Sequence, residues 1–199
     1  MPLEFDKFGS LFILFRNPVP ADAKGTLTSN FMKLTPLAEL SGSWNVTFDP
    51  QWSDQKEAEF STLVSWTSRP EEGIKHYSGS AVYKKRFDLD MPHDPNIFLD
   101  LGDVRSVAEI ILNGHSLGVL WCPPWRVKVT DYLKEKDNEL EIKVTNLWAN
   151  RVIGDLNLPP EKRFTKTHDI FRFGELQATT PLIESGLLGP VRILSGRVQ

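Results

Sequence analysis

The chain has 199 residues, of which 40% are hydrophobic and 25% are charged, a composition typical of a folded soluble protein. Lysine and arginine total 23 against 26 acidic residues, so the net charge of −3 argues against a surface built to neutralise nucleic-acid phosphates. No basic amphipathic stretch indicates a membrane surface, and the longest apolar run, residues 11–15, is too short to span a bilayer. We therefore expect neither nucleic acid nor a membrane as a partner.

The first third of the chain mixes one strong strand signal with weaker patterns. Residues 10–16 form a continuous apolar run, which predicts a strand buried on both faces. Residues 17–35 are polar and contain Pro18, Pro20 and Gly25, which is typical of a connector. Residues 35–40 and 54–63 are each long enough for a short helix. Residues 44–48 alternate, which puts Trp44, Val46 and Phe48 on one face of a strand.

The remainder of the chain predicts a series of short strands separated by Gly, Pro, Asn and Asp turns. These strands are expected at residues 82–89, 96–101, 106–112, 116–120, 126–130, 139–145 and 190–195. Asn113 and Gly114 tolerate positive φ better than other residues, so we expect a tight hairpin between the third and fourth of them. A single helical turn is predicted at residues 131–134.

Many short strands without long intervening helices indicate an antiparallel sandwich or barrel. The exception is residues 150–189, which contain Pro159, Pro160 and Pro181 and show little strand pattern. A loop of this length is usually functional or packed across a face of the domain.

Several of these segments, in this order, resemble modules of bacterial glycoside hydrolases. The segments LSGSWNVTFDP (40–50), SWT (65–67) and GIKHYSGSAVYKKRF (73–87) resemble the jelly-roll module of α-L-rhamnosidase-like enzymes. Residues 104–118 with Asn113-Gly114, Trp121 and Trp125, VTDYL (129–133) and NELEIKVTN (138–146) are similar to the sugar-binding domain of glycoside hydrolase family 2, and SGLLGPVRI (185–193) is similar to its closing strand.

The resemblance implies an all-β fold, a jelly-roll β-sandwich of two antiparallel sheets like that of galactose-binding domains. We assign this sandwich to residues 37–199. Residues 1–36 are expected to be an N-terminal extension, in which residues 9–16 are similar to the last strand of a preceding β-domain in such enzymes.

The resemblance does not imply that this chain is catalytic. Retaining and inverting glycosidases need two carboxyl groups held in a cleft, and in these enzymes the resemblance places them in a separate barrel domain. Asn138-Glu139 is similar to the Asn-Glu pair of family 2 catalytic sites, but it lies in a predicted turn. We therefore expect no catalytic residue here, and a complete small hydrolase is disfavoured because no paired-carboxylate motif is found.

The candidate substrate-binding residues are aromatic and planar polar side chains: Trp121, Trp125, Trp148, Asn150 and Arg151. Sugar rings have apolar C–H faces that stack on aromatic platforms, while amide and guanidinium groups bind their hydroxyls. If strands 126–130 and 139–145 form an antiparallel pair, the start of one lies beside the end of the other. Trp125, Trp148, Asn150 and Arg151 would then gather at one end of the sandwich. The alternative is that the tryptophans are core or interface residues, as we expect for Trp44 and Trp66.

No cofactor is predicted. Four histidines without ligand spacing do not indicate zinc. The resemblance allows a structural calcium ion, for which Asp100, Asp103 and Asp131 would offer oxygen ligands. The single cysteine, Cys122, is interpreted as a small buried apolar residue.

The predicted function is that of a non-catalytic carbohydrate-binding or accessory module of a glycoside hydrolase acting on polysaccharide. The alternative is a purely structural module that docks onto the parent catalytic domain without binding sugar. The expected partners are therefore carbohydrate and a parent catalytic domain. The N-terminus shows no signal peptide, and one interpretation is that Met1 lies within a longer parent protein. A periplasmic or extracellular bacterial location is implied by the resemblance alone, and the sequence names no particular sugar.

Overall fold

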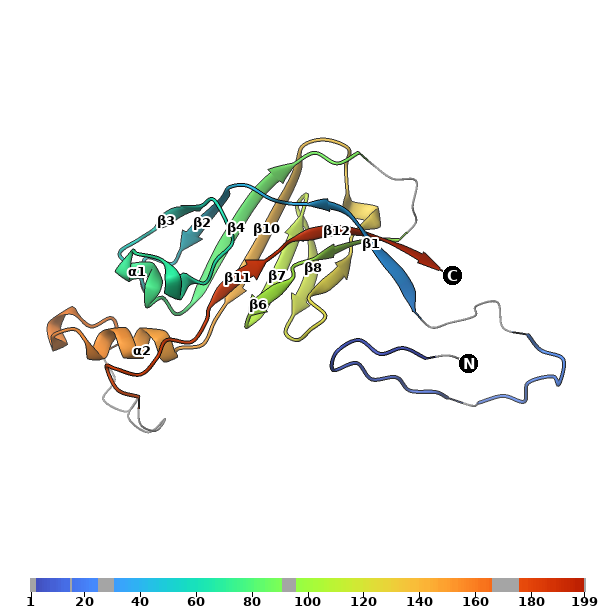
Figure 1. Cartoon of the computed structure of the whole chain (residues 1–199), viewed down its shortest axis with the longest axis horizontal. Helices are drawn as coiled ribbons and strands as arrows, with labels where there is room; N and C mark the ends of the chain where they lie inside the picture. Colours follow the sequence, from blue (N-terminus) through green and yellow to red (C-terminus); the bar gives the residue numbers. More distant parts are fainter. Residues whose placement is uncertain (1–2, 15, 25–30, 91–95, 166–175, 199) are drawn as a thin grey trace.

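The computed structural model describes residues 3–14, 16–24, 31–90, 96–165 and 176–198, and these residues form a sandwich of two antiparallel sheets (Figure 1). The larger sheet has the strand order β3-β2-β4-β10-β7-β8. Its strands are β2 (Trp44–Phe48), β3 (Glu57–Phe60), β4 (Ser80–Phe87), β7 (Val107–Leu112), β8 (His115–Leu120) and β10 (Asn138–Thr145).

The smaller sheet has the order β1-β12-β5-β9, and a separate two-stranded ribbon pairs β11 with β6. The strands of the smaller sheet are β1 (Met32–Glu39), β5 (Ile97–Asp100), β9 (Arg126–Lys128) and β12 (Arg192–Val198), and those of the ribbon are β6 (Asp103–Arg105) and β11 (Gly186–Gly189). The helical elements are η1 (Trp66–Ser68), α1 (Glu72–Lys75), η2 (Thr130–Tyr132), α2 (Ala149–Leu156) and η3 (Pro160–Lys162). The predicted all-β sandwich is therefore confirmed.

The core lies between the two sheets because every second residue of the central strands points inward. Trp44, Val46 and Phe48 of β2 are buried, as predicted. The same alternation buries three residues of β7 and three of β10: Ala108, Ile110, Leu112, Leu140, Ile142 and Val144. Trp66 is fully buried, and its indole N–H donates to the Tyr83 hydroxyl at 2.5 Å. Burial of this kind raises the pKa of the Tyr83 hydroxyl, which therefore stays a neutral hydrogen-bonding group.

The Asn113-Gly114 hairpin is confirmed, and both residues have positive φ, 51° and 81°. The Asn113 side chain also donates to the Tyr132 carbonyl and to Asn138 Oδ1. These bonds attach the hairpin to the connection between β9 and β10. The hairpin therefore lies at the end of the sandwich opposite the C-terminal ends of β8 and β10.

Four local predictions are corrected by the structure. Residues 10–14 and 16 form no strand and are exposed where burial is described, so their apolar run has no sheet to join within the described chain. Residues 35–39 belong to strand β1 rather than to a helix, and the helix expected over 54–63 is replaced by strand β3. The stretch from 150 to 189 is not one loop, because it contains most of α2 and all of η3 and β11; its residues 166–175 lie outside the described chain.

Candidate functional site: the aromatic end of the sandwich

Four strands of the larger sheet, β4, β7, β8 and β10, begin or end at one end of the sandwich. The last residue of β10, Thr145, lies opposite Ser80 at the start of β4 and Val107 at the start of β7. The last residue of β8, Leu120, lies opposite Ala108. The segments that follow β10 and β8 therefore leave the sheet at the same end, with β7 between the two strands. We call the exposed apolar side chains here the aromatic end: Trp121, Leu147, Trp148 and Ile183.

Trp148 is exposed yet held in place. Half of its surface is accessible, and its ring meets the Trp52 ring edge to face, with centroids 4.7 Å apart at 85°. Trp52 in turn packs against the hydrophobic core. The Trp148 carbonyl accepts the Val152 N–H and opens helix α2. An aromatic ring fixed in this way has lost most of its rotamer freedom before any ligand arrives, which favours stacking.

Asn150 is buried, and its amide group organises the neighbouring chain. Its Oδ1 accepts the Ile183 N–H at 2.8 Å, and its Nδ2 donates to the Ile183 carbonyl at 2.7 Å and to Ser185 Oγ at 3.0 Å. Asn146 Nδ2 also donates to Ser185 Oγ. The Asn150 side chain therefore fixes residues 183–185 beside α2, and its hydrogen-bonding capacity is spent inside the protein.

Arg151 is buried as well, against the second half of α2. Its Nε lies 3.0 Å from Asp155 Oδ1, and its guanidinium stacks 4.5 Å from the centre of the Phe164 ring. Burial lowers the pKa of the guanidinium, and the Asp155 carboxylate opposes that shift. Asp155 Oδ2 also accepts the Thr165 N–H at 2.7 Å. This pair therefore fastens residues 164–165 onto α2 rather than facing solvent.

The two tryptophans of the loop between β8 and β9 differ in burial. Trp125 is 8% exposed and belongs to the core, and its carbonyl accepts the Leu101 N–H at 2.8 Å. Trp121 is 75% exposed. The two prolines between them, with a half-buried Cys122, place one ring in the core and the other outside it.

The strand pairing from which the site was predicted is wrong, although the end of the sandwich is shared. Strand β9 pairs with β5 in the smaller sheet, whereas β10 pairs with β4 and β7 in the larger one. The two strands thus belong to opposite layers, because the partner of β9, Phe98–Asp100, is part of the smaller sheet. Trp148, Asn150 and residues 183–185 are brought together directly, while Trp125 is withdrawn into the core.

Two charged residues that the sequence analysis did not single out, Arg105 and Glu184, meet just before β7 and β11. Arg105 Nη2 is 2.7 Å from Asp103 Oδ2 and 3.1 Å from Glu184 Oε2. The ribbon creates this contact by pairing Arg105 with Gly186. No pattern in the sequence links residues 105 and 184, because the strand pair that joins them is short and separated by about 80 residues of chain.

The described residues contain no group of three or more His, Cys, Asp or Glu side chains placed to hold a metal ion. Of the three aspartates considered for calcium, Asp100 accepts the Gly102 N–H and lies 3.5 Å from Arg126 Nε, and Asp103 pairs with Arg105. Within the part of the chain that the structure covers, no helix has the length and apolar character needed to cross a membrane.

Comparison with known proteins places this geometry in a family. Residues 68–167 match the model of the glycosyl hydrolase 2 galactose-binding domain-like family. The chain is 37% identical over 176 residues to a "Putative beta-glucuronidase" of Formosa agariphila, an alignment that covers 77% of this chain and 15% of that protein.

Among solved structures, the rhamnosidase from Novosphingobium sp. PP1Y superposes with a TM-score of 0.73 at 30% identity, covering 90% of this chain and 16% of that one. A β-D-glucuronidase of Dictyoglomus thermophilum matches at a TM-score of 0.47 and 23% identity, covering 59% of this chain and 20% of that one. The chain thus spans about one sixth of the length of the rhamnosidase and of the curated relative.

Proposed function

Because the chain belongs to the glycosyl hydrolase 2 galactose-binding domain-like family, we propose that it serves a longer glycoside hydrolase as a non-catalytic carbohydrate-binding or accessory module. The likeness to one sixth of a rhamnosidase and of a named glucuronidase supports the role of a part rather than of a whole enzyme. The parent catalytic domain is then its partner, and polysaccharide is the substrate class of the parent. A periplasmic or extracellular location belongs to the same proposal.

The observation that carries the sugar-binding part is Trp148, a half-exposed ring braced edge to face on Trp52. Trp121, at the same end, offers a second exposed ring. In this proposal the two rings contact sugar, while Asn150, Arg151 and Trp125 hold the platform from inside. Arg105 and Glu184 supply charged groups at the same end. Two aromatic contacts without a deep cleft give weak binding, with a dissociation constant of roughly micromolar to millimolar.

The test is a titration with a panel of neutral and acidic oligosaccharides, followed by tryptophan fluorescence. We expect a saturable change with at least one glycan, and its loss in Trp148→Ala. Tyr132→Ala is the matched control, because Tyr132 is an exposed aromatic residue beside the Asn113-Gly114 hairpin, at the other end of the sandwich. Equal affinities in wild type and Trp148→Ala would reject the aromatic end as the sugar site.

The second candidate function is a structural module that binds no sugar. It is favoured by Leu147 and Ile183, two exposed apolar residues near Trp148 of the kind that anchor protein interfaces. No fluorescence response to any glycan of the panel, from a chain that still folds, would select this candidate.

A further inference from the structure

The smaller sheet has apolar side chains on its outer face, the face that points away from the core between the two sheets. Ile97, Leu99 and Ile193 point into the core, so Phe98 and Leu194, which are paired neighbours, point the other way. Leu194 is only 8% exposed although it is not part of the core. Other side chains must therefore cover it from outside the sandwich.

Gly196 allows this outer face to close up. A Cβ atom at Gly196 would lie 2.9 Å from the Phe98 ring, 3.2 Å from Leu34 Cδ2 and 3.2 Å from Met32 Sδ. The absence of a side chain at Gly196 lets Phe98, Leu34 and Met32 approach one another over β12. The result is a continuous apolar layer along β1, β12 and β5.

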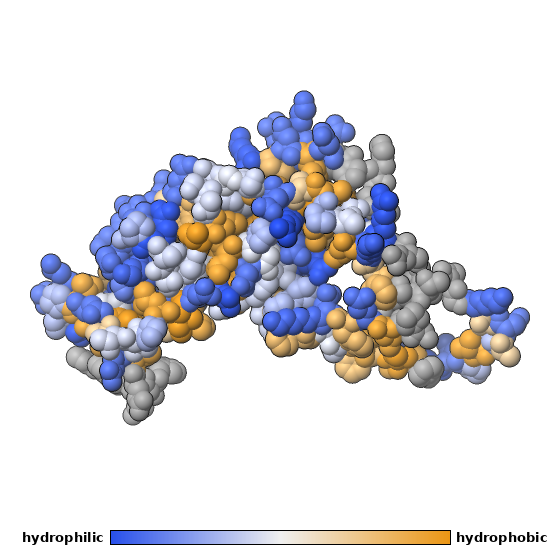
Figure 2. All heavy atoms as spheres, in the orientation of Figure 1, coloured by the Kyte–Doolittle hydropathy of each residue, from blue (hydrophilic) through white to orange (hydrophobic). Residues whose placement is uncertain are grey.

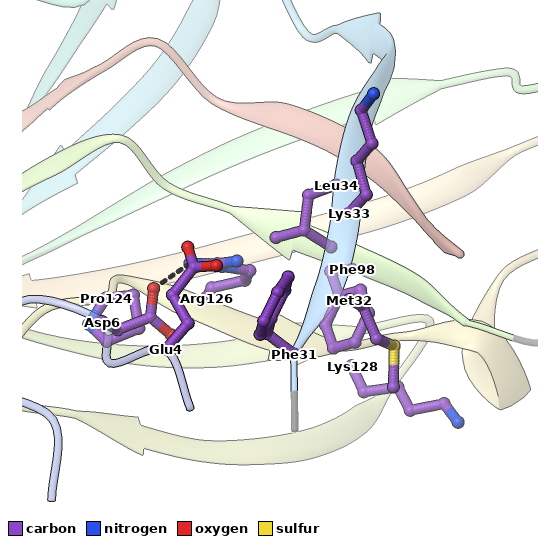
Figure 3. A pocket seen from close by; sticks show the side chains of 10 residues that line it. All are labelled: Glu4, Asp6, Phe31, Met32, Lys33, Leu34, Phe98, Pro124, Arg126 and Lys128. Atoms are coloured by element: carbon purple, nitrogen blue, oxygen red, sulfur yellow. Dashed lines mark hydrogen bonds and ion pairs between the residues drawn. The ribbon is translucent and has the colours of Figure 1, made fainter. Parts of the chain in front are cut away.

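A groove of about 720 Å³ opens over this layer, and we call it the outer groove. Its apolar wall is Phe31, Met32, Leu34 and Phe98, and its charged rim includes Arg126, Lys128 and Lys33. Figure 3 shows the Phe31 ring between the Arg126 group and Phe98 with Met32. Glu4 and Asp6 close the remaining side, where Asp6 Oδ1 lies 3.3 Å from Arg126 Nη2.

The N-terminal segment, whose Glu4 and Asp6 line the outer groove, carries further exposed apolar side chains. Its large apolar side chains are 37–87% exposed: Leu3, Phe5, Phe8, Leu11, Phe12, Ile13 and Leu14. Figure 2 shows apolar residues gathered where this segment approaches the start of β1. Exposed apolar side chains in this number mark an interaction site, because a folded protein gains by removing them from water.

We infer that the outer groove and residues 3–14 form one docking surface, and that its occupant is a folded domain of the same longer glycoside hydrolase polypeptide. The inference depends on the proposed function, since it requires a parent enzyme. The relatives that share this fold have more than five sixths of their length outside it, which supplies such a domain. The cations at the rim select its chemistry: an apolar centre edged with carboxylates that meet Lys33 and Lys128. Helix α2, which Trp148 caps, lies away from β1 and the N-terminal segment, so Trp148 stays open to sugar (Figure 1).

Hydroxyl-radical footprinting with mass spectrometry tests this surface in the full translation product of the gene and in the 199-residue chain alone. We expect oxidation of Met32, Phe98 and residues 3–14 to fall at least fivefold in the full product. Ile111 is the internal control, because it is a partly exposed apolar residue on the outer face of the other sheet and should label equally in both samples. A Phe98→Glu variant of the full product should regain labelling at Met32, whereas Ile111→Glu should not.

Equal labelling of Met32 and Phe98 in the two samples would overturn the inference, as would a natural polypeptide that contains only these 199 residues. Protection that grows with concentration of the 199-residue chain alone would assign the surface to a second copy and also overturn it. Trp148 labelling with and without oligosaccharide separates the two proposals. If oligosaccharide protects Trp148 but Met32 is not protected in the full product, only the docking surface is rejected. If Met32 is protected in the full product but oligosaccharide does not protect Trp148, only the sugar site is rejected.

Discussion

The outer faces of the two sheets are built from opposite chemistry. On the larger sheet, cross-strand neighbours form the ion pairs Lys84–Glu141, Arg86–Glu139 and Lys143–Glu109, all of them exposed to solvent. On the smaller sheet, Met32, Leu34 and Phe98 line the outer groove, and the buried Leu194 is paired with Phe98. A sandwich needs only its inner faces to be apolar. The outer face of the larger sheet therefore suits contact with water, whereas the apolar outer face of the smaller sheet supports the proposal that it contacts another protein domain.

The largest difference should come from placing a polar amide on each face. Leu194→Asn places an amide at a buried position paired with Phe98, so we expect it to lower the free energy of unfolding by about 2–4 kcal/mol. Ile111→Asn on the larger sheet should cost less than about 1 kcal/mol, because the amide can reach water. Urea unfolding of both variants measures the contrast. Equal losses would mean that the two faces do not differ in burial.

The next largest difference between the two outer faces should come from adding side-chain volume to each. Gly196→Val puts a branched side chain into the space between Phe98, Leu34 and Met32, and we expect a loss of about 1–3 kcal/mol. Thr47→Val on β2 changes a partly exposed residue of the other sheet and should shift the unfolding free energy by less than about 0.5 kcal/mol. Thermal unfolding followed by circular dichroism measures both. A Gly196→Val protein as stable as wild type would show that the apolar layer is loosely packed.

The ion pairs of the larger sheet should matter little. Glu141→Gln removes the partner of Lys84, 2.9 Å away, and we expect a loss of about 0.2–0.5 kcal/mol at low ionic strength because both side chains are well exposed. Added salt should shrink this loss further. Chemical unfolding at low and at high sodium chloride concentration measures the effect. A loss that persists in high salt would indicate a role for Glu141 beyond charge pairing.

The junction of α1 and α2 belongs to neither outer face. We expect His76 at this junction to make the stability of the fold depend slightly on pH. Burial lowers the pKa of His76, with the Glu72 carboxylate opposing that shift. The unfolded chain therefore binds the proton more tightly than the folded one. The His76 contribution to stability is complete above pH 6.5 and declines as the pH falls from 6.5 through the lower pKa of the folded state. The unfolding midpoint of wild type should decrease over this interval relative to His76→Gln, and parallel pH profiles would contradict the assignment.

The sequence predicted the fold well where alternation was strong. Trp44, Val46 and Phe48 take the predicted face of β2, and Asn113-Gly114 forms the predicted hairpin, because both depend on local rules of side-chain direction and backbone conformation. Strand β1 was missed because most of its residues are exposed and Pro36 interrupts the pattern, so only the pairing with β12 holds it in place.

The candidate site was harder to predict because its geometry is set by contacts between distant segments. Trp121 and Trp125 have similar sequence surroundings, yet one is exposed and the other is in the core. Asn150 and Arg151 look like surface donors, but Asn150 hydrogen-bonds to Ile183 and Arg151 forms a buried ion pair with Asp155. Arg105 and Glu184 meet only through the β6–β11 ribbon, whose pairing no local pattern reveals.

The most direct test of the contrast between the two outer faces is an experimental structure, by electron cryomicroscopy or crystallography, of the full translation product that contains this chain. The account predicts that protein covers the sheet β1-β12-β5-β9 over Phe98 and Met32, while the face bearing Lys84 and Glu141 stays in solvent. A structure in which Phe98 and Met32 face solvent, or in which the charged face is the one covered, would contradict it.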